Sequence, residues 1–139
     1  MNNVNINDQN FINSEVYKKF MEENPGRGTL LIRASAAKEA IPIANLDIIV
    51  RKKINKYNVI FFQGKTDSSG MIKNLSLPTP AQNINDLTVP PSTNYEIIAT
   101  TQNNNVQTTY IVNMYNNICV IQNINITPTM EERRYYYGY

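Results

Sequence analysis

Seven short segments in which apolar and polar residues alternate constrain the fold of this chain most strongly. Alternation at every second position places the apolar side chains on one face of a β-strand. The segments cover residues 29–35, 46–53, 59–66, 72–77, 95–101, 106–112 and 118–127. No helix-length pattern separates them, which argues against a parallel α/β sheet. The sequence therefore predicts an all-β domain over residues 27–128, built as a seven-stranded sandwich of two sheets.

Turn-forming residues follow the third segment. The Asp67 side chain can accept hydrogen bonds from nearby backbone amides and Gly70 tolerates a positive φ, so we expect a tight hairpin turn after Thr66. A calcium site at Asp67 is the alternative, but one carboxylate supplies too few ligands. Pro78 and Pro80 lack an amide hydrogen, and they are predicted to end the next strand and send the chain to the other sheet.

The first ten residues form a strand-like arm ahead of the sandwich. Val4 and Ile6 alternate with asparagines, as in a strand with one apolar face. An open sandwich leaves edge strands free, so we expect the arm to add a strand to another copy of the protein. Pairing with an edge of its own sandwich is the alternative.

An amphipathic helix with a closing turn is predicted over residues 11–26. Its apolar stripe includes Val16, Phe20 and Met21, and Asn13 or Ser14 is the candidate N-cap. A helix this short is marginal alone, so the stripe must dock on its own domain or on a neighbour. Residues 59–62 are apolar on both strand faces, which favours the helix as a cover for the outer face of that strand.

The last predicted strand contains two unusual side chains. Gln122 interrupts an apolar row with Ile124 and Ile126, so we expect it to be hydrogen-bonded in the interior or to lie at a bulge. Cys119 is the single cysteine and cannot form a disulfide within the chain. A buried, unreactive thiol is the favoured interpretation, and a covalent bond to a second chain is the alternative.

Residues 129–139 form a tyrosine-rich tail. Four of the nine tyrosines lie in the last five residues: Tyr135, Tyr136, Tyr137 and Tyr139. A free chain end rarely carries so much aromatic surface, so these rings are predicted to dock on a partner surface.

Known catalytic patterns are absent from the sequence. Without histidine, no histidine-based triad or general base can form. Glu22 and Glu23, and Glu131 and Glu132, are the adjacent carboxylates, and neighbouring side chains do not converge on one substrate. We therefore expect no enzymatic activity, no cofactor and no metal ion.

Charge and hydropathy limit the partners. The net charge of +2 is too balanced for a nucleic-acid-binding chain, and the basic run at residues 51–56 is interpreted as a solvated hairpin. No apolar run has the length of a membrane span or of a secretion signal, so we expect synthesis in the cytoplasm and no membrane span.

The segments "GTLLIRASAAKEAIPIANLDIIV", "GKTDSSGMIKNLSLPTP", "YEIIATT" and "ICVIQNINITP" resemble carboxypeptidase-regulatory-like domains of the transthyretin-like (prealbumin-like) sandwich superfamily, over residues 24–128. Among these domains, the motifs resemble most those of the version found in clostridial spore and cortex-lytic proteins. The shared motifs contain Ala40, Pro42 and Ile43, then Thr66, Asp67 and Gly70, then Leu77, Pro78 and Pro80. The resemblance implies a transthyretin-like sandwich and carries little information on chemistry.

Two functions remain after these exclusions. The favoured one is a non-enzymatic structural subunit that binds copies of itself through Val4, Ile6 and the tail tyrosines, forming a filament, appendage or surface coat. The resemblance implies a spore or cell-wall surface as its final location. The alternative is a binding or regulatory module associated with a cell-wall or spore-cortex lytic enzyme.

Overall fold

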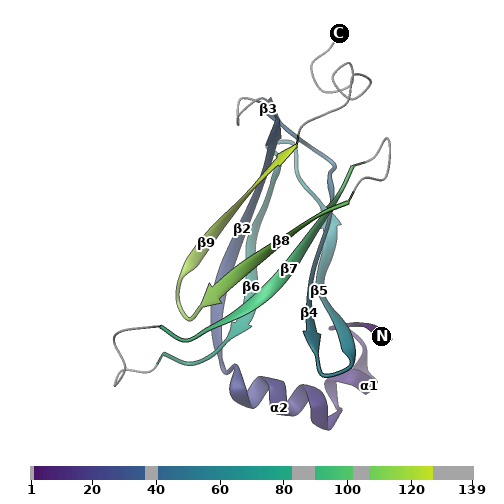
Figure 1. The fold of residues 1–139 in the computed structure, drawn as a ribbon, viewed down its shortest axis with the longest axis vertical. Helices are drawn as coiled ribbons and strands as arrows, with labels where there is room; N and C mark the ends of the chain where they lie inside the picture. Colours follow the sequence, from purple (N-terminus) through teal and green to yellow (C-terminus); the bar gives the residue numbers. More distant parts are fainter. Residues whose placement is uncertain (1, 37–40, 83–89, 102–106, 127–139) are drawn as a thin grey trace.

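The computed structural model describes residues 2–36, 41–82, 90–101 and 107–126 (Figure 1). The elements are β1 (Asn2–Asn5), α1 (Gln9–Ile12), α2 (Glu15–Glu23), β2 (Gly26–Ala36), β3 (Ile41–Pro42), β4 (Asp47–Ile54), β5 (Tyr57–Lys65), β6 (Met71–Thr79), β7 (Ser92–Thr100), β8 (Gln107–Tyr115) and β9 (Cys119–Ile126). Each of the seven predicted strands is present, with small differences at the ends. The predicted all-β, two-sheet fold is therefore confirmed.

The strands form one five-stranded sheet and one four-stranded sheet. The first has the order β1-β5-β4-β7-β8. In the second, β2 pairs in parallel with β9 along Thr29–Ala36, and it pairs antiparallel with β6 and β3. Because β9 occupies one edge of β2 over that range, β6 and β3 share the other edge. In the described part of the chain, β8 and β9 are thus edge strands of different sheets.

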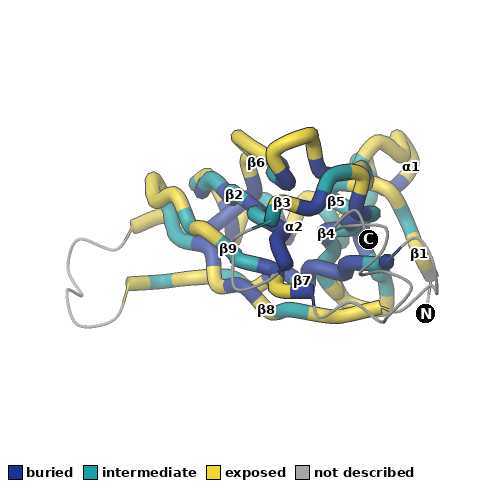
Figure 2. The backbone as a smooth tube through the Cα atoms, turned by 90° about the horizontal axis from the view of Figure 1, so that it is seen from above, coloured by how far each residue is buried: buried dark blue, intermediate teal, exposed yellow. Residues whose placement is uncertain are grey.

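The main core lies between the two sheets, where buried backbone segments face one another (Figure 2). Tyr95 on β7 is 1% exposed, and its hydroxyl donates a 2.5 Å hydrogen bond to the carbonyl of Pro78 on β6. Its ring packs edge-on against Phe61, with centroids 5.2 Å apart. The hydrogen bond to Pro78 therefore joins the two sheets, whereas the ring contact with Phe61 lies within the five-stranded sheet. Burial raises its pKa well above the ordinary value for tyrosine.

The tight turn predicted after Thr66 is present, but it is not a hairpin turn, because β5 and β6 lie in different sheets. Asp67 Oδ1 accepts hydrogen bonds of 2.9 Å from the amides of Ser69 and Met71. Gly70 has a φ of 76°, and a Cβ there would collide with the backbone oxygen of Ala34. Glycine is therefore required at Gly70 for two independent reasons.

Thr66 and Pro42 join this turn to the neighbouring strands. The buried Thr66 hydroxyl accepts from the Leu46 amide at 3.0 Å and donates to the Ile43 carbonyl at 2.7 Å. Pro42 lies opposite Ser35 in the short β3. Both residues thus have structural roles at one end of the sandwich.

The prediction that the prolines end their strand at Leu77 was wrong, whereas the predicted passage to the other sheet is confirmed, because β7 lies in the five-stranded sheet. β6 continues to Thr79, with Pro78 opposite Arg27, and the half-buried Pro80 follows the strand end. Arg27 directs its amide to the Asn116 side chain at 3.1 Å and its carbonyl to the Asn117 amide at 2.8 Å. The pair therefore needs no amide from Pro78, and a proline is tolerated in this strand.

Helix α2 docks on its own domain, one of the two arrangements left open. It begins after Ser14, whose Oγ accepts from the Tyr17 amide at 3.2 Å. Phe20 is buried in a cluster with Ile54 and Val59, so the helix contacts the β4–β5 hairpin. The sequence predicts this helix over the outer face of β5. Instead, α2 runs across one end of the two sheets (Figure 1).

Phe61 explains why residues 59–62 are apolar on both faces. Its ring lies 6.0 Å from the ring of Phe20 and contacts Tyr95 on the other side. One side chain therefore connects the helix cluster with the main core. The β4–β5 register shifts between Val50 and Arg51, which allows consecutive residues of β5 to face the interior.

The N-terminal arm pairs with its own chain, contrary to the favoured prediction. β1 lies parallel to β5, from Asn2 opposite Tyr57 to Asn5 opposite Ile60. Val4 and Ile6, predicted as assembly residues, pack against the helix cluster. The short helix α1 was not predicted. Its N-cap Asp8 accepts from the Asn10 amide at 2.9 Å, and this cap helps to turn the chain back toward β5.

The predictions for the two unusual side chains of the last strand, Cys119 and Gln122, fared differently. Cys119 is exposed, so the predicted burial was wrong. It lies at the start of β9 on the outer face, whereas Ile124 and Ile126 face the core. Gln122 is half-buried and donates to the Asn123 carbonyl at 2.9 Å, and β9 pairs with β2 without a bulge.

Candidate assembly surface

Large exposed apolar side chains occur on the two edge strands β8 and β9 and on the turn between them. In the described ranges the exposed large hydrophobic residues are Ile111 on β8, Ile118 in the β8–β9 turn and Ile121 on β9, with exposed fractions of 59%, 47% and 52%. Together with the exposed Cys119 they form what we name the β8–β9 edge surface. The strands diverge from their common turn, so their free edges begin at the same end of the molecule (Figure 1).

The β8–β9 turn is fixed tightly on β2. Asn117 has a φ of 60°, and the Thr29 amide donates to the Ile118 carbonyl at 3.0 Å. A Cβ at Gly28 would lie only 2.5 Å from the carbonyl oxygen of Tyr115. Glycine at Gly28 therefore allows the turn to approach β2 closely enough for these hydrogen bonds.

Each exposed isoleucine sits on the outer face of its own sheet. Ile111 lies opposite Glu96, which forms a 2.9 Å ion pair with Arg51. Ile121 lies opposite the half-buried Leu31. A strand added to either edge would cover one of these isoleucines and satisfy free backbone groups of the edge strand.

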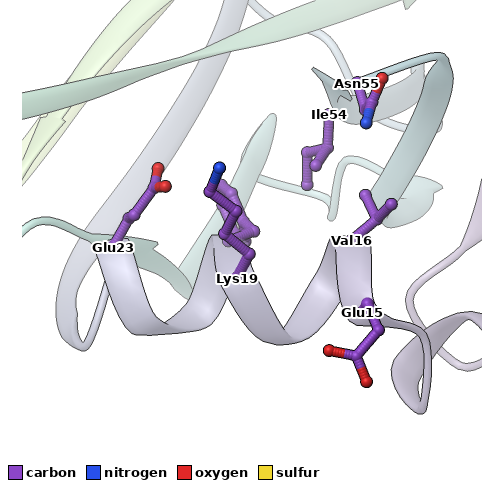
Figure 3. A pocket seen from close by; sticks show the side chains of 7 residues that line it. Glu15, Val16, Lys19, Glu23, Ile54 and Asn55 are labelled. Carbon is purple, nitrogen blue, oxygen red and sulfur yellow. The ribbon is translucent and has the colours of Figure 1, made fainter.

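A second feature is an open groove beside α2, with a volume of ≈ 470 Å³. It is lined by Glu15, Val16, Lys19, Phe20, Glu23, Ile54 and Asn55. The side chains of Lys19 and Glu23 rise from α2 on the side of the strands, whereas Glu15 points away (Figure 3). The groove therefore has an apolar floor and a charged rim.

The carboxylates of the described residues are spread over the molecule. Within ranges 2–36, 41–82, 90–101 and 107–126, no three His, Cys, Asp or Glu side chains lie together as metal ligands. Three carboxylates in these ranges are in ion pairs: Asp47 with Lys65 at 2.6 Å, Glu96 with Arg51 at 2.9 Å and Glu15 with Lys18 at 4.0 Å. None of the helices in these ranges has the length and hydropathy of a membrane span.

The basic run at residues 51–56 does not present one cationic patch. Arg51 is held by Glu96, while Lys52 donates to the Asn94 carbonyl at 2.8 Å and lies 5.6 Å from the centre of the Tyr95 ring. Burial lowers the pKa of Lys52. Lys53 and Lys56 remain exposed. The run is thus divided between structural and solvated side chains.

Some residues singled out in the sequence lie outside the described residues. They are Ala40 and the remaining predicted assembly residues, Tyr135, Tyr136, Tyr137 and Tyr139.

Sequence reasoning missed the exposed isoleucines. Ile121 could have been found, because it is the one large apolar residue in the row with Cys119, Asn123 and Asn125. Ile118 was assigned to the buried row, but it precedes the strand and belongs to the turn.

Comparisons with known proteins give little further information. No protein-family model matches the chain, and no curated protein has a matching sequence. The structure is similar to that of Klebsiella pneumoniae 5-hydroxyisourate hydrolase, a transthyretin-like fold, with 12% identity and a TM-score of 0.46. The likeness covers 73% of this chain and 92% of the hydrolase. At this distance it bears on neither activity nor site.

Proposed function

We propose that the chain is a non-enzymatic structural subunit that binds copies of itself through the β8–β9 edge surface. The observation that carries the proposal is the location of Ile111, Ile118 and Ile121 on and between two edge strands. Burial of one isoleucine side chain contributes roughly 1.5–3 kcal/mol, so these residues can supply a useful part of an association energy. The N-terminal arm, paired within the chain, has no part in this version of the assembly.

The chemistry of the described residues supports a structural role rather than an enzymatic one. The chain has no histidine, and its described carboxylates include three in ion pairs and one in a turn. Exposed apolar residues on edge strands are a liability for a monomer, because an unpaired edge can template association. In a subunit of an assembly, the same edge strands would form the contacts with neighbouring copies.

Cys119 provides a probe of this surface without any substitution. We expect a maleimide to label the thiol rapidly at low protein concentration, and more slowly at high concentration as neighbouring copies cover the start of β9. Urea-unfolded protein at each concentration is the control for intrinsic thiol reactivity. A labelling rate that stays independent of protein concentration would contradict contact at β9.

A further inference from the structure

The groove beside α2 has the composition of a site for an aromatic chain segment. Val16, Phe20 and Ile54 supply apolar surface, and Lys19 and Glu23 stand at the rim (Figure 3). The volume of ≈ 470 Å³ falls within the range of about 300–1,000 Å³ that is usual for ligand sites. An occupant should therefore combine rings for the floor with a cation for Glu23.

The C-terminal segment of the chain has this composition. Arg133 and Arg134 directly precede Tyr135, Tyr136 and Tyr137. An arginine can form a charge-assisted hydrogen bond with Glu23, while a tyrosine ring packs on apolar side chains and keeps its hydroxyl in water. A lysine such as Lys19 can also pack over the face of a tyrosine ring.

The last described residue of the chain lies at the far end of the molecule from the groove. Helix α2 immediately precedes β2, and the last described residue, Ile126, lies opposite Ala36 at the end of β2 (Figure 1). From Gly26 to Ala36 the strand extends about 33 Å at the usual rise per residue. The nine residues from Ile126 to Tyr135 span at most about 32 Å when fully extended. Tyr135 and the two arginines before it therefore reach the groove of another copy more readily than their own, whereas Tyr139, with about 47 Å of extended chain from Ile126, can reach either.

We propose that residues 133–139 of one copy bind in the α2 groove of the next copy. This proposal rests on the proposed self-assembly and adds a second contact to the β8–β9 edge surface. The donor segment and the acceptor groove belong to opposite ends of one chain. Such a head-to-tail contact is heterologous, so it builds a ring when the rotation closes and an open filament when it does not.

Photo-cross-linking in the full-length protein tests this contact. Tyr136 is replaced by the photoreactive residue benzoylphenylalanine, and this protein is mixed with an equal amount of unsubstituted protein labelled with ¹⁵N. We expect cross-linked peptides that join residue 136 of one isotope to residues 15–23 or 54–55 of the other. Cross-links confined to one isotope, or to β8 and β9, would overturn the proposal.

Two substitutions on α2 make the test specific. Glu23→Lys places a cation where an arginine should bind, so the yield of these cross-links should fall about tenfold, as expected for the loss of one charge-assisted hydrogen bond. Glu22→Lys is the matched control, because Glu22 is exposed on the same helix and does not line the groove. Equal losses in the two variants would also overturn the proposal.

The molar mass of the same samples distinguishes failure of the tail contact from failure of self-assembly. If the protein assembles but no cross-link reaches the groove, the tail contact is wrong while self-assembly stands. If the protein is monomeric at every concentration, the self-assembly itself is wrong, and the tail contact is lost with it.

Discussion

Replacing Ile111 and Ile121 by lysine in one chain is expected to convert the assembled protein into a monomer with an unchanged fold. Both side chains are more than half exposed, so the substitutions cost little folding free energy. Burial of two isoleucines contributes about 3–6 kcal/mol to a contact, which corresponds to a weakening of roughly 10²- to 10⁴-fold when they are lost. Sedimentation velocity measures the change in particle size.

A matched control distinguishes loss of the edge surface from a general charge effect. The double variant Gln63→Lys and Ser68→Lys adds the same charge at exposed positions on β5 and in the following turn. This control should assemble as the unmodified protein does. The single variants at Ile111 and Ile121 then show whether the β8 edge or the β9 edge makes the stronger contact. Unchanged particles in the isoleucine double variant would exclude the β8–β9 edge surface.

Tyr95→Ala is expected to destabilise the fold by about 3–5 kcal/mol, as large aromatic truncations in a core do. This is a large fraction of the roughly 5–15 kcal/mol that stabilises an ordinary domain. Tyr95→Phe keeps the ring against Phe61 but leaves the buried Pro78 carbonyl without its donor, at a cost of about 1–3 kcal/mol. Urea unfolding of the three proteins gives the values. A cost below that of Tyr95→Phe for the alanine variant would contradict the bridging role.

The raised pKa of Tyr95 also gives the sign of a pH effect. Above pH 10 the unfolded chain loses the phenolic proton while the folded chain keeps it, so stability falls as the pH rises. The slope from this residue approaches about 1.4 kcal/mol per pH unit. Lys52, with its lowered pKa, acts in the opposite direction, but only at pH values below its ordinary pKa. Between pH 10.5 and 12, Tyr95→Phe should therefore flatten the decline.

Local chemistry in the sequence was sufficient to predict most of the fold. Alternation located all seven main strands, and the Asp67 and Gly70 pair predicted a turn whose hydrogen bonds and positive φ are present. Ser14 was one of two candidate caps for the helix and is the one used. These features depend on neighbouring residues, which is why a single sequence reveals them.

Features that depend on distant partners could not be predicted. The pattern of Val4 and Ile6 indicated a strand but not that it would lie parallel to β5 of the same chain. The exposure of Cys119 follows from the parallel pairing of β9 with β2, which sets the face that each residue occupies. Pro78 is tolerated because Arg27 turns its hydrogen-bonding groups to the β8–β9 turn. Each outcome depends on the topology.

Self-assembly is tested most directly by the molar mass of the intact protein over a range of concentrations. Static light scattering or sedimentation equilibrium should give a mass that rises with concentration above the 15.9 kDa of one chain. Deleting residues 133–139 should shift the rise to higher concentration, whereas deleting residues 1–10 should act through stability, because β1 pairs within the chain. A mass of 15.9 kDa at every concentration would contradict self-assembly and favour a monomeric binding module.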